Sequence, residues 1–154
     1  ICAVAALALF SAGLCAGEIW QTDFKKASEE AKAAKKFMVL DFSGSDWCGW
    51  CKKLDAEVFS TKEFKEYAEK NLVCVLLDFP RSKEQSDELK KQNKELAGKY
   101  KIRGYPTVLV LSPDGELVET TGYQDGGGAK YVEYLKGVIE KFQKKAGEAE
   151  SKGK

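Results

Sequence analysis

Two cysteines with two residues between them are the part of this chain best suited to chemistry. Cys48 and Cys51 flank Gly49 and Trp50, a few residues after an apolar stretch at 37–42. If this segment opens a helix, the two sulfurs project to one side and can close or open a disulfide with little backbone motion. The helix N-terminus also carries partial positive charge, which favours the thiolate form of Cys48. The spacing therefore predicts a thiol–disulfide redox site.

The same pair would also suit a structural disulfide or half of a zinc site. Structural zinc takes four ligands, but the chain contains no histidine, and beyond residue 17 its only further cysteine is Cys74. A c-type haem attachment needs histidine directly after Cys51, where Lys52 stands. We therefore expect no metal and no cofactor, and we expect Cys74 to be an inert thiol in the core.

Composition and charge are those of a folded domain. Of the 154 residues 44% are apolar, and 25 basic residues are balanced by 24 acidic ones. This length gives room for one domain with a core and little for a second. The balanced charge argues against a nucleic-acid groove, so no nucleic-acid partner is expected.

Residues 1–17 differ in kind from the rest of the chain. No charged residue precedes Glu18, and the apolar run ends in small residues, with Cys15 and Gly17 three and one positions before Glu18. This pattern is typical of a secretory signal peptide cut ahead of Glu18, and the front of that signal is expected to be missing from the sequence. The alternative is an uncleaved membrane anchor, although a span needs about 20 apolar residues. We therefore expect export to the periplasm or another extracytoplasmic compartment.

The remaining chain alternates between helical and strand patterns. Helices are predicted at 23–36, 48–58, 61–70 and 82–99 and after Gly128, and strands at 37–43, 72–77, 107–111 and 116–121. Alternation favours parallel strand pairing, and the turn at 112–115 closes an antiparallel hairpin. The predicted fold is an α/β domain over 18–143, with a central mixed sheet and helices on both faces. A flexible tail is expected at 144–154.

Local signals refine this outline. Thr22 and Ser82 are residue types that cap helices, and each is expected to cap the helix that follows it. Residues 60–63 resemble a capping box that restarts a helix. The glycines at 126–128 lack the lysine of a phosphate loop, so they indicate a flexible connector.

Two motifs in this order resemble the thioredoxin superfamily. They are Val39-Leu40-Asp41-Phe42 with Trp47-Cys48-Gly49-Trp50-Cys51-Lys52, and Lys101-Ile102-Arg103-Gly104-Tyr105-Pro106-Thr107. The similarity covers residues 37–142 and is strongest to the exported, Dsb-type branch. It implies a thioredoxin fold and dithiol–disulfide exchange, in which an exposed Cys48 attacks a substrate disulfide and Cys51 resolves the mixed disulfide.

In this family an acidic residue below the cysteine pair helps to take the proton from the second cysteine. Asp41 matches that residue, because it lies in an apolar strand where a carboxylate is costly without a role. It stands seven residues before Cys48, one more than the usual spacing, so the loop between them is expected to bulge. The alternative for Asp41 is a strand-end residue hydrated by that polar loop. Asp46 is expected to have a loop or cap role.

Pro106 resembles the cis-proline of the family, which faces the cysteine pair. A cis bond there would leave the main chain of Tyr105 free to pair with an extended substrate segment. The alternative is an ordinary trans proline that opens an edge strand. Trp47, Trp50, Tyr105 and Pro106 are predicted to form an apolar rim that binds polypeptide substrates.

These residues predict an exported thiol–disulfide oxidoreductase that acts on protein disulfides as a reductase or isomerase. Neither Gly49 nor Trp50 is basic, so the charge that makes some such pairs strongly oxidising is absent. The expected partners are exported proteins with disulfides and a membrane dithiol protein as electron donor, and the expected state is a monomer. Two alternatives stay open, namely a peptide-binding or chaperone-like module without turnover and a net dithiol oxidase.

Overall fold

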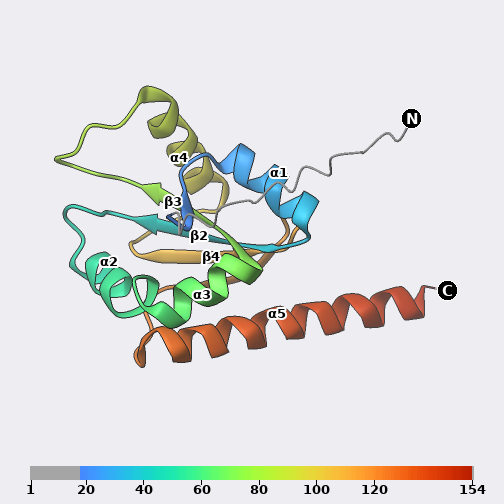
Figure 1. Cartoon of the computed structure of the whole chain (residues 1–154). Helices are drawn as coiled ribbons and strands as arrows, with labels where there is room; N and C mark the ends of the chain where they lie inside the picture. Colours follow the sequence, from blue (N-terminus) through green and yellow to red (C-terminus); the bar gives the residue numbers. More distant parts are fainter. Residues whose placement is uncertain (1–17, 154) are drawn as a thin grey trace, which may run out of the picture.

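A five-stranded sheet lies between helices in the structure, a computed structural model that describes residues 18–153 (Figure 1). The predicted signal segment 1–17 lies outside the described residues. The strands are β1 Trp20–Gln21, β2 Phe37–Ser43, β3 Leu72–Asp78, β4 Thr107–Leu111 and β5 Leu117–Thr121. The helices are α1 Phe24–Ala34, α2 Gly49–Leu54, the π-helix η1 Asp55–Phe59, α3 Lys62–Asn71, α4 Asp87–Lys99 and α5 Gly127–Lys152.

The sheet has the order β1-β3-β2-β4-β5, with β2 at its centre. β2 runs parallel to β3 and antiparallel to β4, so that Asp41 lies opposite Leu76 on one side and Val108 on the other. All seven residues of β2 are buried, as its nearly unbroken apolar run indicates. The α/β architecture expected from the sequence, with a central mixed sheet and helices on both faces, is confirmed. The sequence does not predict β1, which has only two residues.

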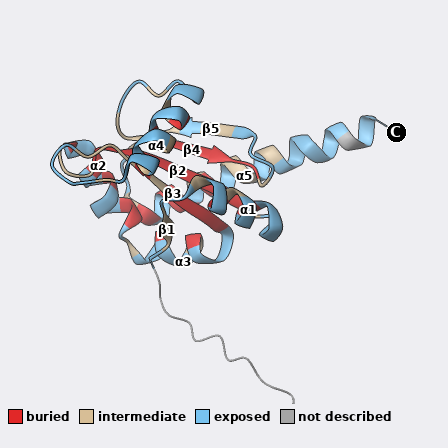
Figure 2. Cartoon of the chain, turned by 90° about the horizontal axis from the view of Figure 1, so that it is seen from above, coloured by how far each residue is buried: buried red, intermediate tan, exposed pale blue. Residues whose placement is uncertain are grey.

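Alternate residues of β2 face two hydrophobic clusters, one on each side of the sheet. Val39 belongs to a cluster that includes buried residues of α3, α5 and η1, whereas Met38 and Leu40 belong to one that includes residues of α1 and α4. Figure 2 shows the buried strands between helices whose outer surfaces are exposed. The end of β2, where the cysteines follow, is therefore held from both faces of the sheet.

Two helices begin later than the sequence indicates. Asp23, and not Thr22, caps α1 by accepting a backbone hydrogen bond at 3.0 Å. Ser86, and not Ser82, caps α4. The reason is tertiary, because Ser82 lies in a turn whose backbone N–H groups are bound to the Asp46 carboxylate. Helix α4 therefore begins only after this turn.

The glycines at 126–128 form a tight contact and not a flexible connector. Gly126 has a φ of 113°, and the next two glycines begin α5. A Cβ on Gly128 would overlap the hydroxyl of Thr61, which caps α3, and would crowd the carbonyl of Val58 in η1. Glycine here lets the start of α5 pack directly against η1 and α3.

Helix α5 extends beyond the sheet toward the C-terminus (Figure 1). It is helical as far as Lys152, through most of the segment 144–154 that the sequence predicts as a flexible tail. The flexibility of that segment stays a prediction. Among residues 18–153, none of the helices is both long and apolar enough to cross a membrane.

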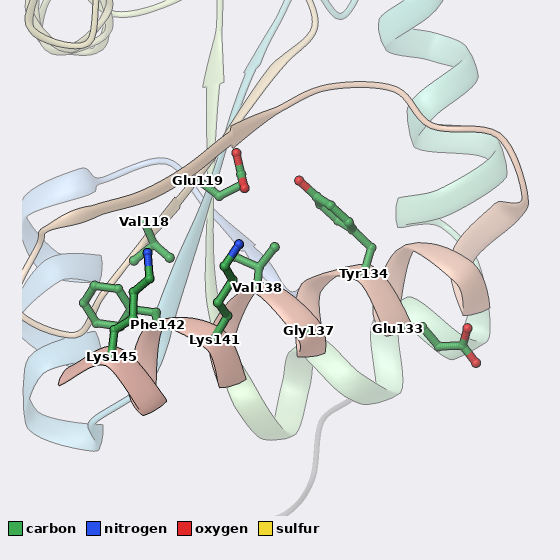
Figure 3. Close-up of a pocket in the computed structure, with 9 residues that line it drawn as sticks. All are labelled: Val118, Glu119, Glu133, Tyr134, Gly137, Val138, Lys141, Phe142 and Lys145. Carbon is green, nitrogen blue, oxygen red and sulfur yellow. The ribbon is translucent and has the colours of Figure 1, made fainter. Parts of the chain in front are cut away.

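A groove of about 490 Å³ lies between β5 and α5 (Figure 3). Its apolar floor includes Val118, Val138 and Phe142, and charged side chains such as Glu119 and Lys141 stand along it. Neither member of the cysteine pair lines this groove. The groove is therefore separate from the cysteine pair, which follows the end of β2.

Candidate active site

The cysteine pair lies where β2 leads into α2. Cys48 is the N-cap of α2, Cys51 is in its first turn, and the two form a disulfide with a Cα–Cα distance of 5.2 Å. The backbone N–H of Cys51 donates to Cys48 Sγ at 3.2 Å, and that of Gly44 donates to Cys51 Sγ at 3.5 Å. Both sulfurs therefore lie against N–H donors, which stabilise a thiolate once the disulfide opens.

Cys48 is less exposed than the sequence indicates. Only 7% of its surface is accessible in the disulfide form. As the N-cap residue it turns its side chain toward the helix end, where Sγ accepts a backbone hydrogen bond. Attack by this sulfur on another protein therefore requires close contact between that protein and the residues around Cys48.

The loop between β2 and α2 is bound to the loop that follows β3. Ser45 donates its backbone N–H to the Asp78 carboxylate at 2.9 Å, and its hydroxyl donates to the same group. The Asp46 carboxylate accepts backbone hydrogen bonds from residues 81–83, and those from Arg81 and Ser82 contribute most to lowering its pKa. Asp46 thus has the expected loop role. These bonds fix the segment that carries the first cysteine.

Trp47 joins the same two loops. Its Nε1–H donates to the carbonyl of Phe79 at 2.8 Å, and the guanidinium of Arg81 lies 3.9 Å from the centre of its ring. A Cβ on Gly44 would overlap the indole, so glycine is required there. The indole also meets Tyr105 edge-on, with 5.7 Å between ring centroids. This contact brings the second sequence motif next to the cysteine pair.

The Tyr105–Pro106 peptide bond is cis, as the family resemblance implies. Pro106 directly precedes β4, whose first residue Thr107 pairs with Phe42 near the end of β2. The cis bond therefore lies at the same edge of the sheet as the cysteines. Gly122, just after β5, comes close to this bond, because a Cβ on it would lie 3.1 Å from the Pro106 carbonyl oxygen.

Trp50 lies on the outside of α2 with 58% of its surface exposed. Its ring contacts Tyr123, in the loop between β5 and α5, with 5.2 Å between centroids. The ammonium of Lys53 lies over both rings. Sequence reasoning missed Tyr123 and Lys53 as neighbours of the site, because Tyr123 lies far along the chain and no local pattern links it to the cysteines.

Asp41 is buried at the centre of the sheet, with 7% of its surface exposed. Its Oδ1 has no hydrogen-bond partner within the described part of the chain. Burial, and then the nearby carboxylates of Asp55 and Asp78, raise the pKa of Asp41 to about 8. A carboxyl group that is normally ionised at neutral pH is therefore largely protonated here, yet close to its titration point.

A pocket of about 300 Å³ links this carboxyl to the second cysteine. Asp41, Cys51 and Asp55 all line it, together with Lys52 and Trp20. The sequence analysis did not identify Asp55, although it follows Cys51 by four residues in the sequence. That spacing places two side chains on the same helix face and could have pointed to it. Asp41 and Cys51 thus line the same pocket.

Cys74 lies in β3 with 2% of its surface exposed and is not part of the disulfide. Burial, followed by the charge of Asp41, raises the pKa of its thiol to about 12. Such a thiol stays protonated and unreactive at neutral pH. Within residues 18–153 no group of three His, Cys, Asp or Glu side chains is placed to hold a metal ion.

The chemistry open to this arrangement is thiol–disulfide exchange. The pair can store two electrons as two thiols and release them by forming the observed disulfide. The helix N-terminus favours a thiolate on the first sulfur, and the buried carboxyl lies in the same pocket as the second. Trp47 and Trp50 flank Cys48 in the sequence by one and two positions, and Trp47 contacts Tyr105.

Comparisons with known proteins agree with this chemistry. The family model of the thioredoxin-like domain matches residues 24–137. The disulfide bond reductase DsbH of Chlamydia pneumoniae is 35% identical over 120 residues, which cover 78% of this chain and 72% of that protein. A solved structure of the DsbH oxidoreductase aligns with a TM-score of 0.75 at 35% identity, covering 79% of this chain and 83% of that one.

The thioredoxin-related protein DsbJ of Chlamydia pneumoniae is a more distant relative. It is 28% identical over 123 residues, which cover 79% of this chain. The same alignment covers only 35% of DsbJ, so the chain spans about a third of the length of that protein. What the two proteins share is therefore one domain of a longer chain.

Proposed function

The chain belongs to the thioredoxin-like domain family, and we propose that it is an exported protein-disulfide reductase. Its fold and its Cys48–Cys51 disulfide are those of a thiol–disulfide oxidoreductase. The observation that carries the finer proposal is the 35% identity to DsbH, whose name is disulfide bond reductase, over most of both chains. The contact between Trp47 and Tyr105, which joins the two sequence motifs, is a geometric observation that also supports this proposal.

In the first step the thiolate of reduced Cys48 attacks one sulfur of a substrate disulfide. The bond between the two substrate sulfurs breaks, a mixed disulfide with Cys48 forms, and the other substrate sulfur leaves as a thiolate. The N-terminus of α2 and the backbone N–H of Cys51, which donates to Cys48 Sγ, stabilise the attacking thiolate.

In the second step Cys51 loses its proton and attacks Cys48 Sγ. The second substrate sulfur is released as a thiolate, and the Cys48–Cys51 disulfide of this structure forms. The substrate has then gained two electrons, and the cysteine pair has lost two. We assign the ionised fraction of Asp41 as the acceptor of the Cys51 proton, because both residues line one pocket and a pKa of about 8 leaves part of the carboxyl ionised at neutral pH.

The substrate is a polypeptide that binds along the rim of Trp47, Trp50, Tyr105 and Pro106. The main chain at Tyr105 pairs with an extended segment of the substrate, as in strand addition. The aromatic rings cover the apolar side chains that flank the substrate cysteine. The low exposure of Cys48 supports this assignment, since a substrate must contact the rim to reach the sulfur.

We place this reaction outside the cytoplasm on the basis of the signal-like segment 1–17. A reductase that works in an oxidising compartment must itself be reduced after each turnover. The proposed donor is a membrane dithiol protein, whose thiols would open the Cys48–Cys51 disulfide by the reverse of the two steps above.

Insulin reduction by dithiothreitol tests the proposed activity. The mature chain 18–154 should accelerate precipitation of the insulin B chain, and its Cys48→Ser variant should not. If the parent protein is no faster than dithiothreitol alone, the chain is a peptide-binding module without turnover.

The reduction potential of the cysteine pair distinguishes a reductase from an oxidase. Equilibration against glutathione buffers should give a value near that of thioredoxin, about −270 mV. A value near about −120 mV, where strong oxidants lie, would assign net oxidase activity instead. Reactivation of scrambled ribonuclease, measured in parallel, would reveal isomerase activity.

A further inference from the structure

Four side chains form a cluster around the exposed Trp50, and only Trp50 among them belongs to the proposed rim. The others are Lys53 of α2, Glu57 of η1 and Tyr123 of the loop between β5 and α5. The ring centroids of Trp50 and Tyr123 are 5.2 Å apart, with 51° between the planes. The Lys53 ammonium lies 5.0 Å from the centre of the first ring and 4.8 Å from that of the second. A single cation thus holds two aromatic rings.

Tyr123 is anchored at its hydroxyl and at its backbone. The hydroxyl donates to the Glu57 carboxylate and lies 3.1 Å from a carboxylate oxygen of Asp125. The bond to Glu57 holds the pKa of Tyr123 well above its usual range, so the hydroxyl remains a donor at all physiological pH values. The preceding residue, Gly122, lies against the carbonyl of Pro106. The ring is therefore held against Trp50 and Lys53 of α2 and Glu57 of η1, and the residue before it approaches the cis-proline.

The charges of the cluster are already paired with each other. Lys53 Nζ lies 4.0 Å from a Glu57 carboxylate oxygen, in addition to its contacts with the rings. What the cluster offers to a partner is therefore aromatic surface, above all the exposed face of Trp50, and not a free charge. Rings that are already held in place lose little freedom when a ligand packs on them.

We propose that Tyr123 is a specificity-determining residue of the disulfide exchange, an inference that rests on the proposed function. Trp50 and Tyr123 form one platform, which binds a large apolar or aromatic side chain next to the reacting cysteine of a polypeptide substrate. Trp50 of this platform belongs to α2 and stands between Cys48 and Cys51 in the sequence. Lys53 and Glu57 are positioning residues that hold the two rings at their observed angle.

Three disulfide substrates test this platform with the mature protein. Two are disulfide-linked peptides of equal length and charge, with leucine or serine next to the cysteine, and the third is oxidised glutathione. The second-order rate constant for oxidation of the reduced protein is measured with each. Tyr123→Ala should lower the rate constant for the leucine peptide about three- to tenfold. It should leave the rate constant for glutathione within about twofold of the parent.

A matched lysine–tyrosine pair at the other end of the sheet supplies the control. Lys136 Nζ lies 5.4 Å from the centre of the Tyr67 ring, and both residues line a pocket with Phe37, the first residue of β2. Lys53→Gln should reduce the preference for the leucine peptide over the serine peptide, whereas Lys136→Gln should leave it unchanged. Tyr123→Phe keeps the ring and should keep most of that preference.

A double-mutant cycle tests whether the two rings act as one surface. If they do, Trp50→Ala combined with Tyr123→Ala should lose little more than the larger single effect. Two effects that multiply fully would overturn the single platform. A Tyr123→Ala protein that slows equally with all three substrates would overturn the specificity role, because that residue would then support only the fold. Failure of the parent protein to react with any of the three disulfides would instead refute the proposed function.

Discussion

Asp41 makes the stability of the fold depend on pH. Its carboxyl has the ordinary pKa of 3.8 in the unfolded chain, whereas burial, with Asp55 and Asp78, raises the pKa to about 8 in the folded protein. Between these two values the folded state holds a proton that the unfolded state has lost. The contribution of this group is therefore most favourable below about pH 4 and is lost progressively as the pH rises to about 8.

The Asp41→Asn variant should remove this dependence. At pH 8 it should be more stable than the parent by on the order of a few kcal/mol, while at pH 4 the two proteins should unfold alike. Urea unfolding followed by circular dichroism at several pH values measures the difference. Parallel stability curves for the two proteins would show that Asp41 does not titrate in this range.

Asp55 is the second cause of the raised pKa and can be removed separately. Asp55→Asn should lower the pKa of Asp41 in the folded protein. The fall in stability with rising pH should then end at a lower pH. Because Asp55 is exposed, solvent screens its charge and the displacement should stay below about one pH unit. Glu63→Gln, which removes an exposed carboxylate at the start of α3, should leave the curve in place. Equal displacements in both variants would point to net charge as the cause.

The order in which the cysteines react can be tested by trapping. Cys51→Ser leaves Cys48 able to attack but unable to be released, so mixed disulfides should accumulate at least about tenfold over the parent. Diagonal electrophoresis of the exported fraction would detect them. Cys74→Ser should trap nothing, since that thiol is buried. Adducts that accumulate in Cys48→Ser with Cys51 intact, and not in Cys51→Ser, would reverse the roles of the two cysteines.

For single residues, the sequence predicts the roles that a local motif identifies. It misses contacts between residues that are far apart in the chain. The spacing of Cys48 and Cys51, the burial of Asp41 and the cis bond before Pro106 can all be inferred from motifs, and the structure has the pair bonded, the aspartate buried and the bond cis. Tyr123 reaches Glu57 across 66 positions of sequence, so no window of the chain contains both.

Among the elements, the start of α5 depends on a glycine with no room for a side chain. Gly128→Ala should destabilise the protein by about 1–3 kcal/mol, because the new methyl group would collide with Thr61. Gly137→Ala in the same helix meets no atom within 4 Å and should stabilise it by about 0.5–1 kcal/mol. Thermal unfolding of the two variants measures both effects. A neutral Gly128→Ala would mean that α5 can shift away from η1.

The elements also show where capping rules alone are insufficient. The capping-box pattern at 60–63 would place the cap at Ser60, but Thr61 caps α3 and the Ser60 hydroxyl donates to the Asp55 carboxylate instead. Ser82 has an equally suitable side chain but lies in the turn bound by Asp46, so the cap passes to Ser86. The sequence likewise predicts one helix from 48 to 58, where the structure has α2 followed by the π-helix η1. Such one-turn changes of hydrogen bonding carry no sequence period of their own.

For the whole molecule, we propose that residues 18–143 form the stable domain. Phe142 contacts Phe37 edge-on at 5.9 Å, and residues 143–149 and 151–153 are exposed. A chain that ends at residue 143 should therefore unfold within about 0.5 kcal/mol of the mature chain and keep its insulin-reduction rate. A chain that ends at 138 also loses Ile139 and Phe142, which pack on the core, and should lose about 2–4 kcal/mol. Chemical unfolding of both chains tests the boundary.

The overall topology could be predicted from the sequence because several independent patterns indicate the same sheet. A buried central strand, the helices before and after it and the closing turn at 112–115 all favour one mixed sheet, and that sheet is present. β1 contributes only two residues at the edge beside β3. Its pairing is set by contact with β3 and not by a pattern of its own, so it could not be predicted.

The buried thiol of Cys74 can report when the sheet opens. Its sulfur is sealed within β3, while the other two cysteines of the described chain are locked to each other in the oxidised protein. A maleimide added to the oxidised chain 18–154 can therefore reach the Cys74 thiol only when the sheet itself separates. The labelling rate therefore reports how often the sheet opens under native conditions, without denaturant, fluorophore or engineered tag.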